Sequence, residues 1–479
     1  MSLKRRKFLR DSLAMTAASA ILPGLLTNCS KTPPPNILWL IAEDLGPDLE
    51  CYRTKRVKTP HLNRLAEEGI LFTQAFTTAP VCSASRSAFM TGMYQTSIDA
   101  HHHRSHREDN YQLSAPVKVV TEYFQQAGYF TSNCSGLAFN KPGKTDWNFT
   151  PAGTPFNGTD WRERQNGQPF FAQINFGEVH RMGNRPHQLT VDPERVELPP
   201  YYPDHPITRK DWAEYLSTVE ILDEKIGLVL NRLEQDGLAE NTIVLFFGDN
   251  GRNHVRGKQW LYDGGIHIPL IVRWPGRLKA GRHDDNLVSA IDFAPTCLAL
   301  AGISIPDHLE GQVFLGPQAS RREYIIAARD RCDETEDRIR CVRTHDFKYI
   351  RNYFPERPYT QYNRYKDAYY PVLRLMQRLH KQNRLTPEQA RFMADSRPPE
   401  ELYWLERDPH ELNNLAGNPD YQETLVKFRQ LLDTWIEETG DRGEIPEDPE
   451  VVARYKKQMK AWAQERVDSL YQTEKGLQE

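Results

Sequence analysis

The chain has 479 residues, of which 39% are hydrophobic and 26% charged, and its formal net charge is -3 at pH 7. A chain of this length can bury a large core and form two domains. The near-neutral charge excludes nucleic acid as an expected partner, because proteins that bind polyanions carry an excess of positive charge. An anionic substrate would therefore be met by positive charge that is local to one pocket.

Residues 1–29 have the layout of an export signal, with a basic stretch at 4–10 followed by an apolar, alanine-rich stretch that ends at Leu26. The segment resembles a twin-arginine leader. Its last four residues, Leu-Thr-Asn-Cys, resemble a lipobox, so Cys29 is a candidate lipidation site and 30–35 a tether; the alternative is cleavage elsewhere. No other apolar run reaches the roughly 20 residues of a spanning helix. We therefore expect a periplasmic or lipid-anchored bacterial protein whose membrane contact is that lipid.

From residue 36 onward, strand and helix patterns alternate, which favours an α/β sheet with helices on both faces. Residues 36–41 form a continuous apolar run that is typical of a buried parallel strand, and residues 242–247 form another. Before the second run, apolar residues recur every three or four positions from 215 to 233. This spacing predicts an amphipathic helix that stops at Gly237.

A second, smaller domain is predicted in the carboxyl-terminal part of the chain. Residues 324–328 and 340–353 have strand character, and helices are expected to pack on them over 386–395 and 420–438. Such a mixture indicates a small α+β unit. We therefore divide the chain into a catalytic domain at 36–317 and a carboxyl-terminal domain at 318–479.

Acidic residues follow both predicted parallel strands directly. Glu43 and Asp44 come after the first strand, and Asp249 and Asn250 come after the second. Ligands of open α/β sheets bind outside the carboxyl ends of the strands. One such pair is more often a turn or a helix cap, but two pairs that flank a candidate nucleophile favour a metal site. Hard oxygen ligands suit calcium or magnesium rather than zinc.

That candidate nucleophile is Cys82, which opens the run Cys82-Ser83-Ala84-Ser85-Arg86 in a stretch that reads as a strand-to-helix turn. A free cysteine is usually a small buried hydrophobic residue. At the amino end of a helix, however, unpaired N–H groups and the helix dipole favour an anion. The run resembles the maturation signature of type I sulfatases, in which the cysteine is oxidised to formylglycine, whose hydrated aldehyde is the nucleophile.

The resemblance to the type I sulfatase family, within the alkaline-phosphatase-like superfamily, extends over about residues 35–479. It implies a large, mostly parallel sheet sandwiched by helices, with a smaller α+β domain at the carboxyl end. The nearest resemblance is to bacterial members described as heparan N-sulfatase-like, a group that includes enzymes active on algal polysaccharides such as ulvan. The matching blocks are Pro35 to Tyr52, the Cys82 run, Asn175-Phe176 with His180, Asp249 to Gly276, and 400–411.

By this resemblance, Glu43, Asp44, Asp249 and Asn250 match the metal ligands of the family, which usually hold calcium, with magnesium as the alternative. Glu43 departs from the commoner aspartate at its position.

The resemblance also assigns catalytic roles. Arg86 matches the arginine that holds the hydrated aldehyde, and His180 and Lys258 match residues that bind and polarise sulfate. Lys144 matches the lysine of a Lys-x-His pair that contacts sulfate. Asp146 stands where that pair has its histidine, so this part of the site departs from the family pattern.

Residues 101–107 read His-His-His-Arg-Ser-His-Arg and form a basic segment soon after Cys82. Consecutive histidines cannot all face one ion, which disfavours zinc. We expect His103 and Arg104 to contact anionic groups of a glycan at the rim of the pocket. The arginines at 329–331 and 338–340 are candidates for the same role, with a solvated strand edge as the alternative.

Together these features predict hydrolysis of sulfate esters or N-sulfates on a sulfated carbohydrate, a polysaccharide or its oligosaccharides, by a formylglycine derived from Cys82 beside a calcium ion. Such a protein needs a formylglycine-generating maturation enzyme as a partner. A phosphodiester or phosphonate monoester hydrolase of the same superfamily is one alternative. A non-catalytic glycan-binding relative is another, if Cys82 is not matured.

Overall fold

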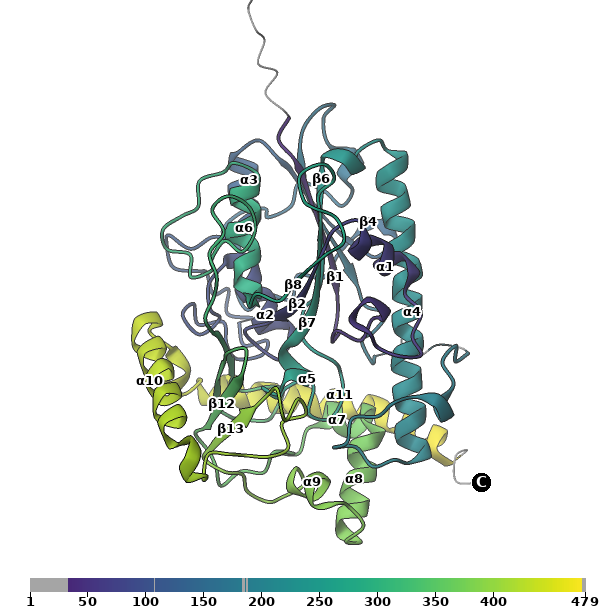
Figure 1. Ribbon diagram of the computed structural model, residues 1–479, viewed down its shortest axis with the longest axis vertical. Helices are drawn as coiled ribbons and strands as arrows, with labels where there is room; N and C mark the ends of the chain where they lie inside the picture. The colour runs from purple at the N-terminus through teal and green to yellow at the C-terminus, as the bar shows by residue number, and fades with distance from the viewer. Residues whose placement is uncertain (1–32, 107, 183–185, 187, 476–479) are drawn as a thin grey trace, which may run out of the picture. The chain divides into compact units, whose positions relative to one another are not determined.

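Two β-sheets organise the chain in the computed structural model, which describes residues 33–475 except 107, 183–185 and 187 (Figure 1). The predicted export signal with Cys29 lies outside the described residues, as do residues 30–32 of the predicted tether. Within the described part, no helix has the length and apolar character needed to cross a membrane.

The larger sheet has nine strands in the order β4-β3-β5-β1-β6-β7-β2-β8, with β9 beside β2. Its middle is parallel, because β1 pairs in parallel with both β5 and β6, while β7 runs antiparallel to β6 and β2. Every residue of β1, β5 and β6 is buried, which explains the continuous apolar runs at 36–41 and 242–247 and confirms both predicted strands. The strands are β1 (Asn36–Ala42), β2 (Ile70–Phe76), β3 (Phe130–Ser135), β4 (Ala138–Pro142), β5 (Phe170–Phe176), β6 (Thr242–Gly248), β7 (His267–Arg273), β8 (Arg282–Asp284) and β9 (Val288–Ser289).

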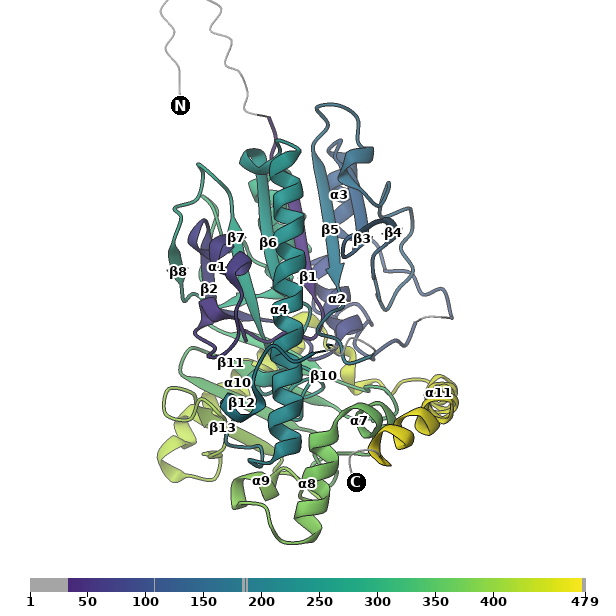
Figure 2. The same ribbon diagram turned by 90° about the vertical axis from the view of Figure 1, so that its right-hand side faces the viewer.

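Helices cover both faces of this sheet (Figures 1 and 2). Leu38 and Leu40 point to one face, where they pack with α1 (Pro60–Glu67) and α4 (Pro206–Gln235). Trp39 points to the other face and meets the rings of Phe89, Phe171, Phe247 and Phe293 edge-on, at 5.0 to 6.4 Å between centroids. That second face carries α2 (Cys82–Thr91), α3 (Val120–Gln126) and α6 (Phe293–Leu300).

The predicted amphipathic helix is α4, whose buried residues include Tyr215, Val219, Leu222, Ile226 and Leu233. It ends at Gln235, and Gly237 follows with a φ of 69°, a left-handed conformation that glycine adopts without steric cost. The predicted stop is therefore confirmed within two residues.

The smaller sheet is antiparallel, in the order β10-β11-β12-β13. Its strands are β10 (Ile325–Arg329), β11 (Ile339–Arg343), β12 (Phe347–Asn352) and β13 (Glu400–Trp404). Helix α10 (Gln422–Thr439) packs Leu425, Phe428 and Leu432 against Val342 and Tyr349 of this sheet. The fold class is thus confirmed, although residues 340–353 form two strands around a turn and the helix expected over 386–395 is shorter.

The other helices are α5 (Asp263–Ile266), α7 (Arg364–Tyr369), α8 (Pro371–Lys381), α9 (Pro387–Arg391) and α11 (Pro449–Lys475). The boundary near residue 318 stays a prediction.

Three arginines in or next to the smaller sheet form buried ion pairs. Arg340 is fully buried and donates to both oxygens of Asp441, with 2.6 Å from Nε to Oδ2, and to Asp330. Arg329 and Arg331 are equally buried. Their carboxylate partners are Asp337 and Glu447 respectively. The expectation that these three arginines contact a glycan or lie along a solvated strand edge is wrong.

We expect Asp441→Ala to lower the free energy of unfolding by about 3 kcal/mol, because it leaves the buried charge of Arg340 only partly compensated. The control is Asp433→Ala, which removes a half-exposed carboxylate from its pair with Arg351 and should cost under about 1 kcal/mol. Urea unfolding of both variants measures the difference. If both variants lost the same free energy of unfolding, Asp441 would not be needed to compensate the buried charge of Arg340.

Candidate functional site

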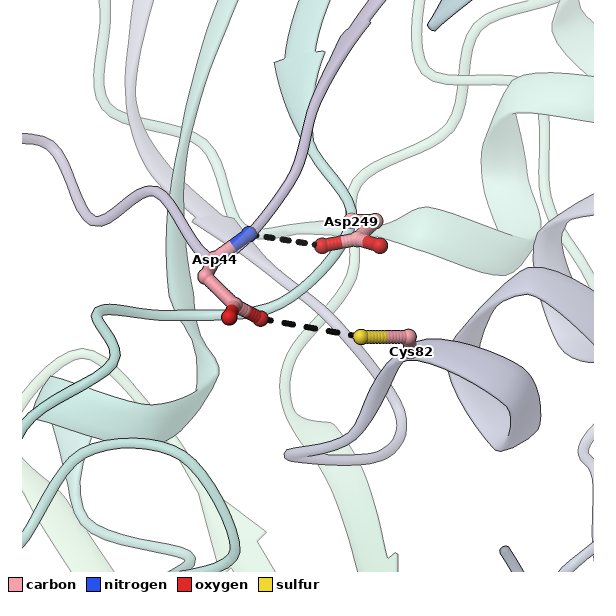
Figure 3. A group of neighbouring side chains, drawn as sticks. All are labelled: Asp44, Cys82 and Asp249. Atoms are coloured by element: carbon pink, nitrogen blue, oxygen red, sulfur yellow. Dashed lines mark hydrogen bonds between the residues drawn. The ribbon is translucent and has the colours of Figure 1, made fainter. Parts of the chain in front are cut away.

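Three segments meet at the carboxyl end of the parallel strands (Figure 3). Strand β1 leads directly into Glu43 and Asp44, strand β6 leads into Asp249 and Asn250, and α2 begins at Cys82. The backbone N–H of Asp44 donates to Asp249 Oδ1 at 2.9 Å, and Cys82 Sγ lies 3.6 Å from Asp44 Oδ1. The topology of the sheet therefore brings both predicted acidic pairs to the predicted nucleophile.

Cys82 is fully buried at the first turn of α2. Burial, followed by the nearby carboxylate of Asp249, raises the pKa of its thiol well above the usual range. Since the thiolate is the reactive form of cysteine, the unmodified side chain is a poor nucleophile in this environment.

Lys258 lies between Asp44 and Cys82 and contacts both. Its Nζ donates to Asp44 Oδ1 at 2.7 Å and to Oδ2 at 2.9 Å, and it lies 3.2 Å from Cys82 Sγ. Burial opposes the charge of the ammonium, but Asp44, together with Cys82, Tyr365 and Tyr370, keeps the pKa of Lys258 well above its usual value. The loop that carries Lys258 is tight, because a Cβ on Gly257 would lie 2.1 Å from the carbonyl oxygen of Arg252.

Arg86 pairs with the second acidic group. One turn into α2, its Nε donates to Asp249 Oδ2 at 2.8 Å and its Nη1 to Asn175 Oδ1 at 2.6 Å. The side chain is 1% exposed. Because Asn175 lies on β5, Arg86 fixes the start of α2 against both β5 and the end of β6.

The carboxylates fit a hard divalent cation. Ligand atoms of Asp44, Cys82 and Asp249 lie within 4.8 Å of one another. The amide of Asn250 donates to Asp44 Oδ1 at 3.0 Å, while its buried Oδ1 has no hydrogen-bond partner among the described residues. Buried acceptors are normally satisfied, and oxygen sets of this kind suit calcium or magnesium. Glu43, the fourth predicted ligand, pairs through Oε2 with Lys144 Nζ at 3.0 Å.

His180 follows β5 and reaches the same cluster. Its Nε2 lies 3.8 Å from Asp44 Oδ2, and its Nδ1 accepts the backbone N–H of Met182 at 3.3 Å. Burial lowers the pKa of this imidazole to about 4, so the ring is neutral at pH 7. Because Nδ1 is an acceptor, the ring proton is on Nε2 and faces the site.

Asp146, the departure from the family pattern, lies between two cations. Its Oδ2 is 3.3 Å from Lys144 Nζ, its Oδ1 is 3.4 Å from Arg104 Nε, and its side chain is 2% exposed. The carboxylate therefore ties Lys144 to Arg104. It adds no positive charge of the kind that a protonated histidine would supply.

The predicted basic segment reaches the site only in part. His103 and Arg104 line the pocket, but His103 is buried and its Nδ1 lies 2.7 Å from Ser83 Oγ on α2. Burial lowers the pKa of His101 and His103 far below the usual range, so both are neutral at pH 7. Among the described residues of this segment, Arg104 therefore supplies the positive charge at the pocket.

A cavity of about 250 Å³ opens beside Lys258 and His180. Part of its wall comes from residues that sequence reasoning did not single out. These are Asp333, Tyr365 and one face of α11, with Val451, Arg454, Tyr455, Gln458, Met459 and Trp462. The helical spacing of the apolar residues of α11 is visible in the sequence, but spacing does not reveal what a helix packs against.

Comparison with known proteins gives consistent matches. A family model described as Sulfatase matches residues 35–303, and one described as N-sulphoglucosamine sulphohydrolase, C-terminal, matches residues 251–373. An ulvan-active sulfatase of Formosa agariphila is 36% identical over 465 residues, which cover 86% of this chain and 76% of that protein. Human N-sulphoglucosamine sulphohydrolase is 28% identical, covering 90% of this chain and 95% of its own.

A solved structure, described in complex with its substrate D-glucosamine-2-N,6-O-disulfate, matches with a TM-score of 0.60 at 18% identity. The match covers 86% of this chain and 100% of that one, and it shows a shared fold.

We expect calcium or magnesium to raise the melting temperature of the protein, because an ion that binds only the folded state stabilises it by about 2.7 kcal/mol at 100 times its dissociation constant. Asp249→Asn should remove the shift, whereas Asp420→Asn, at an exposed position, should keep it. Thermal melts with and without each ion measure both. Stabilisation by zinc alone would contradict the oxygen-ligand assignment.

Proposed function

Because the chain belongs to the sulfatase family, we propose that it removes sulfate from a sulfated carbohydrate with a formylglycine derived from Cys82. The protein is a sulfatase by its family match and its relatives. The observation that carries the finer proposal is the position of Lys258, which lies 3.2 Å from Cys82 Sγ while it bonds both oxygens of Asp44. Lys258 also lines the cavity of about 250 Å³ beside the site.

The burial of Cys82 supports maturation of this residue. A thiol with a strongly raised pKa is a poor nucleophile, so the family chemistry needs another group at this position. At this position a hydrated formylglycine would offer two hydroxyls on one carbon, one to attack sulfur and one whose deprotonation would release sulfate. A formylglycine-generating enzyme of the host is the partner that this proposal requires.

Positive groups around Cys82 are arranged for a sulfate. Lys258 and Lys144 would hydrogen-bond its oxygens and stabilise the negative charge that grows as the sulfur–oxygen bond breaks. Arg86 would hold the matured side chain beside Asp249. His180 would donate a hydrogen bond from its Nε2–H to the leaving oxygen, since its Nδ1 accepts the N–H of Met182.

Asp44, Asp249 and Asn250 would hold the metal, with Glu43 as a fourth ligand. Calcium, or magnesium in its place, would act as a Lewis acid toward the sulfate oxygens. The orphaned Oδ1 of Asn250 supports this assignment.

The relatives suggest the substrate class. One is named for activity on ulvan and another for activity on N-sulphoglucosamine, so both O-sulfated and N-sulfated sugars are candidates. Arg104 supports an anionic glycan, because it brings a second cation to the pocket besides Lys258. We propose that the protein is exported to the periplasm, with Cys29 as a lipid anchor.

Cys82→Ala should abolish turnover, and Cys82→Ser should do so unless the host converts serine, because neither side chain provides two hydroxyls on one carbon. The active wild-type protein should be lighter by the mass difference between cysteine and formylglycine. Intact-protein mass spectrometry and sulfate release measure both. Full turnover by Cys82→Ala would refute the mechanism, and an unconverted, inactive wild type would indicate a glycan-binding protein.

Lys258→Ala should lower kcat/KM by about 100- to 1,000-fold, the usual effect of removing one preorganised donor from a charge-stabilising site. Lys279→Ala, at an exposed position, is the matched control and should change it less than twofold. Steady-state kinetics on 4-nitrophenyl sulfate measure both variants. A change under threefold in Lys258→Ala would remove Lys258 from the sulfate site.

A further inference from the structure

One face of α11 forms a continuous wall of the catalytic pocket. Its lining positions are 451, 454, 455, 458, 459 and 462. Steps of three and one along a helix repeat every turn and mark a single stripe. The stripe combines aromatic rings, apolar side chains and polar groups, so it is unlike a face built only to pack against the core.

Aromatic rings connect this wall to the sulfate end of the pocket. The ring of Tyr365 lies 6.1 Å from His180 and 6.4 Å from Trp462, between centroids, and Lys258 Nζ lies 5.7 Å from its centre. A molecule whose sulfate reaches Lys258 would therefore pass the ring of Tyr365 and meet Trp462.

The polar groups of the wall are held only weakly. Arg454 Nε lies 3.3 Å from Glu108 Oε2, and Gln458 donates to Glu108 Oε1 at 2.9 Å. The side chains of Arg454 and Glu108 are 43% and 53% exposed, and such exposed pairs contribute little free energy. Arg454 and Gln458 can therefore exchange Glu108 for polar groups of a ligand at low cost.

Tyr455, by contrast, is fixed. Its hydroxyl donates to Asp333 Oδ1 at 3.4 Å, and Arg331 lies 4.7 Å from its ring centre. Arg331 in turn pairs with Glu447, just before the first turn of α11. These contacts set the position of the helix, so the exchangeable groups are presented from a rigid support.

We propose that this stripe of α11 binds the sugar that carries the sulfate, with Arg454 and Gln458 hydrogen-bonding its hydroxyl or acidic groups and Trp462 packing on its ring. The proposal rests on the proposed sulfatase function. Aromatic rings with a few convergent polar groups are the usual lining of a small-ligand site, and such sites start at about 300 Å³. The cavity of about 250 Å³ lies just below this range, a size that suits one sulfated sugar rather than several.

The test compares a sugar sulfate with an aryl sulfate, which lacks hydroxyl groups for Arg454 and Gln458. We would measure kcat and KM of the matured enzyme on D-glucosamine 2-N-sulfate, on sulfated ulvan oligosaccharides and on 4-nitrophenyl sulfate. On whichever sugar sulfate the wild type hydrolyses, the Arg454→Ala/Gln458→Ala double variant should lose at least tenfold more kcat/KM than on the aryl sulfate. Most of that loss should appear as a higher KM. Trp462→Ala should raise KM for the sugar more than Trp462→Phe.

Lys457→Ala is the matched control, because it removes a charge from the same helix at an exposed position outside the pocket. It should change each parameter less than twofold. Equal loss on sugar and aryl sulfate in the double variant, or no loss on either, would overturn the role of α11. A matured wild type that cleaves the aryl sulfate but neither sugar would instead overturn the proposed substrate class, and the role of α11 with it.

Discussion

The site depends on neutralising three carboxylates that the fold buries at one point. Glu43, Asp44 and Asp249 arrive at the ends of two adjacent parallel strands, where their negative charges would repel one another. Each has a cation of its own, namely Lys144, Lys258 and Arg86 respectively. The cations come from three other segments, so the ion pairs lock the loop after β6, the start of α2 and the segment after β4 to the edge of the sheet.

Much of this edge could be predicted from the sequence, because burial on both faces leaves a clear pattern. After their first residues, β1 and β6 are apolar throughout, and the first polar residues after them mark where the strands reach the ligand-binding edge. The rule for parallel sheets then places Asp44 beside Asp249, as the structure has them. Helix α4 could be predicted equally well, because one of its faces packs on the sheet and the apolar residues of that face are regularly spaced.

Contacts between side chains far apart in the sequence could not be predicted, because the identity of a residue does not indicate which distant residue it contacts. Arg340 looks the same in the sequence whether it binds a glycan or Asp441, which lies 101 positions away. The same holds for α11, whose apolar spacing indicates a covered face but not the cavity that the face borders. Asp146 stood out as a departure, yet only the structure shows that it joins Lys144 to Arg104.

The complete burial of Cys82 bears on when this residue could be matured relative to folding. The side chain is fully buried once α2 has packed on the sheet beside α6. If Cys82 is matured as we propose, the maturation enzyme would have to reach this segment before α2 packs into the fold. Under the proposed function, a chain that folds first would keep its thiol, so the rate of folding would compete with the rate of maturation.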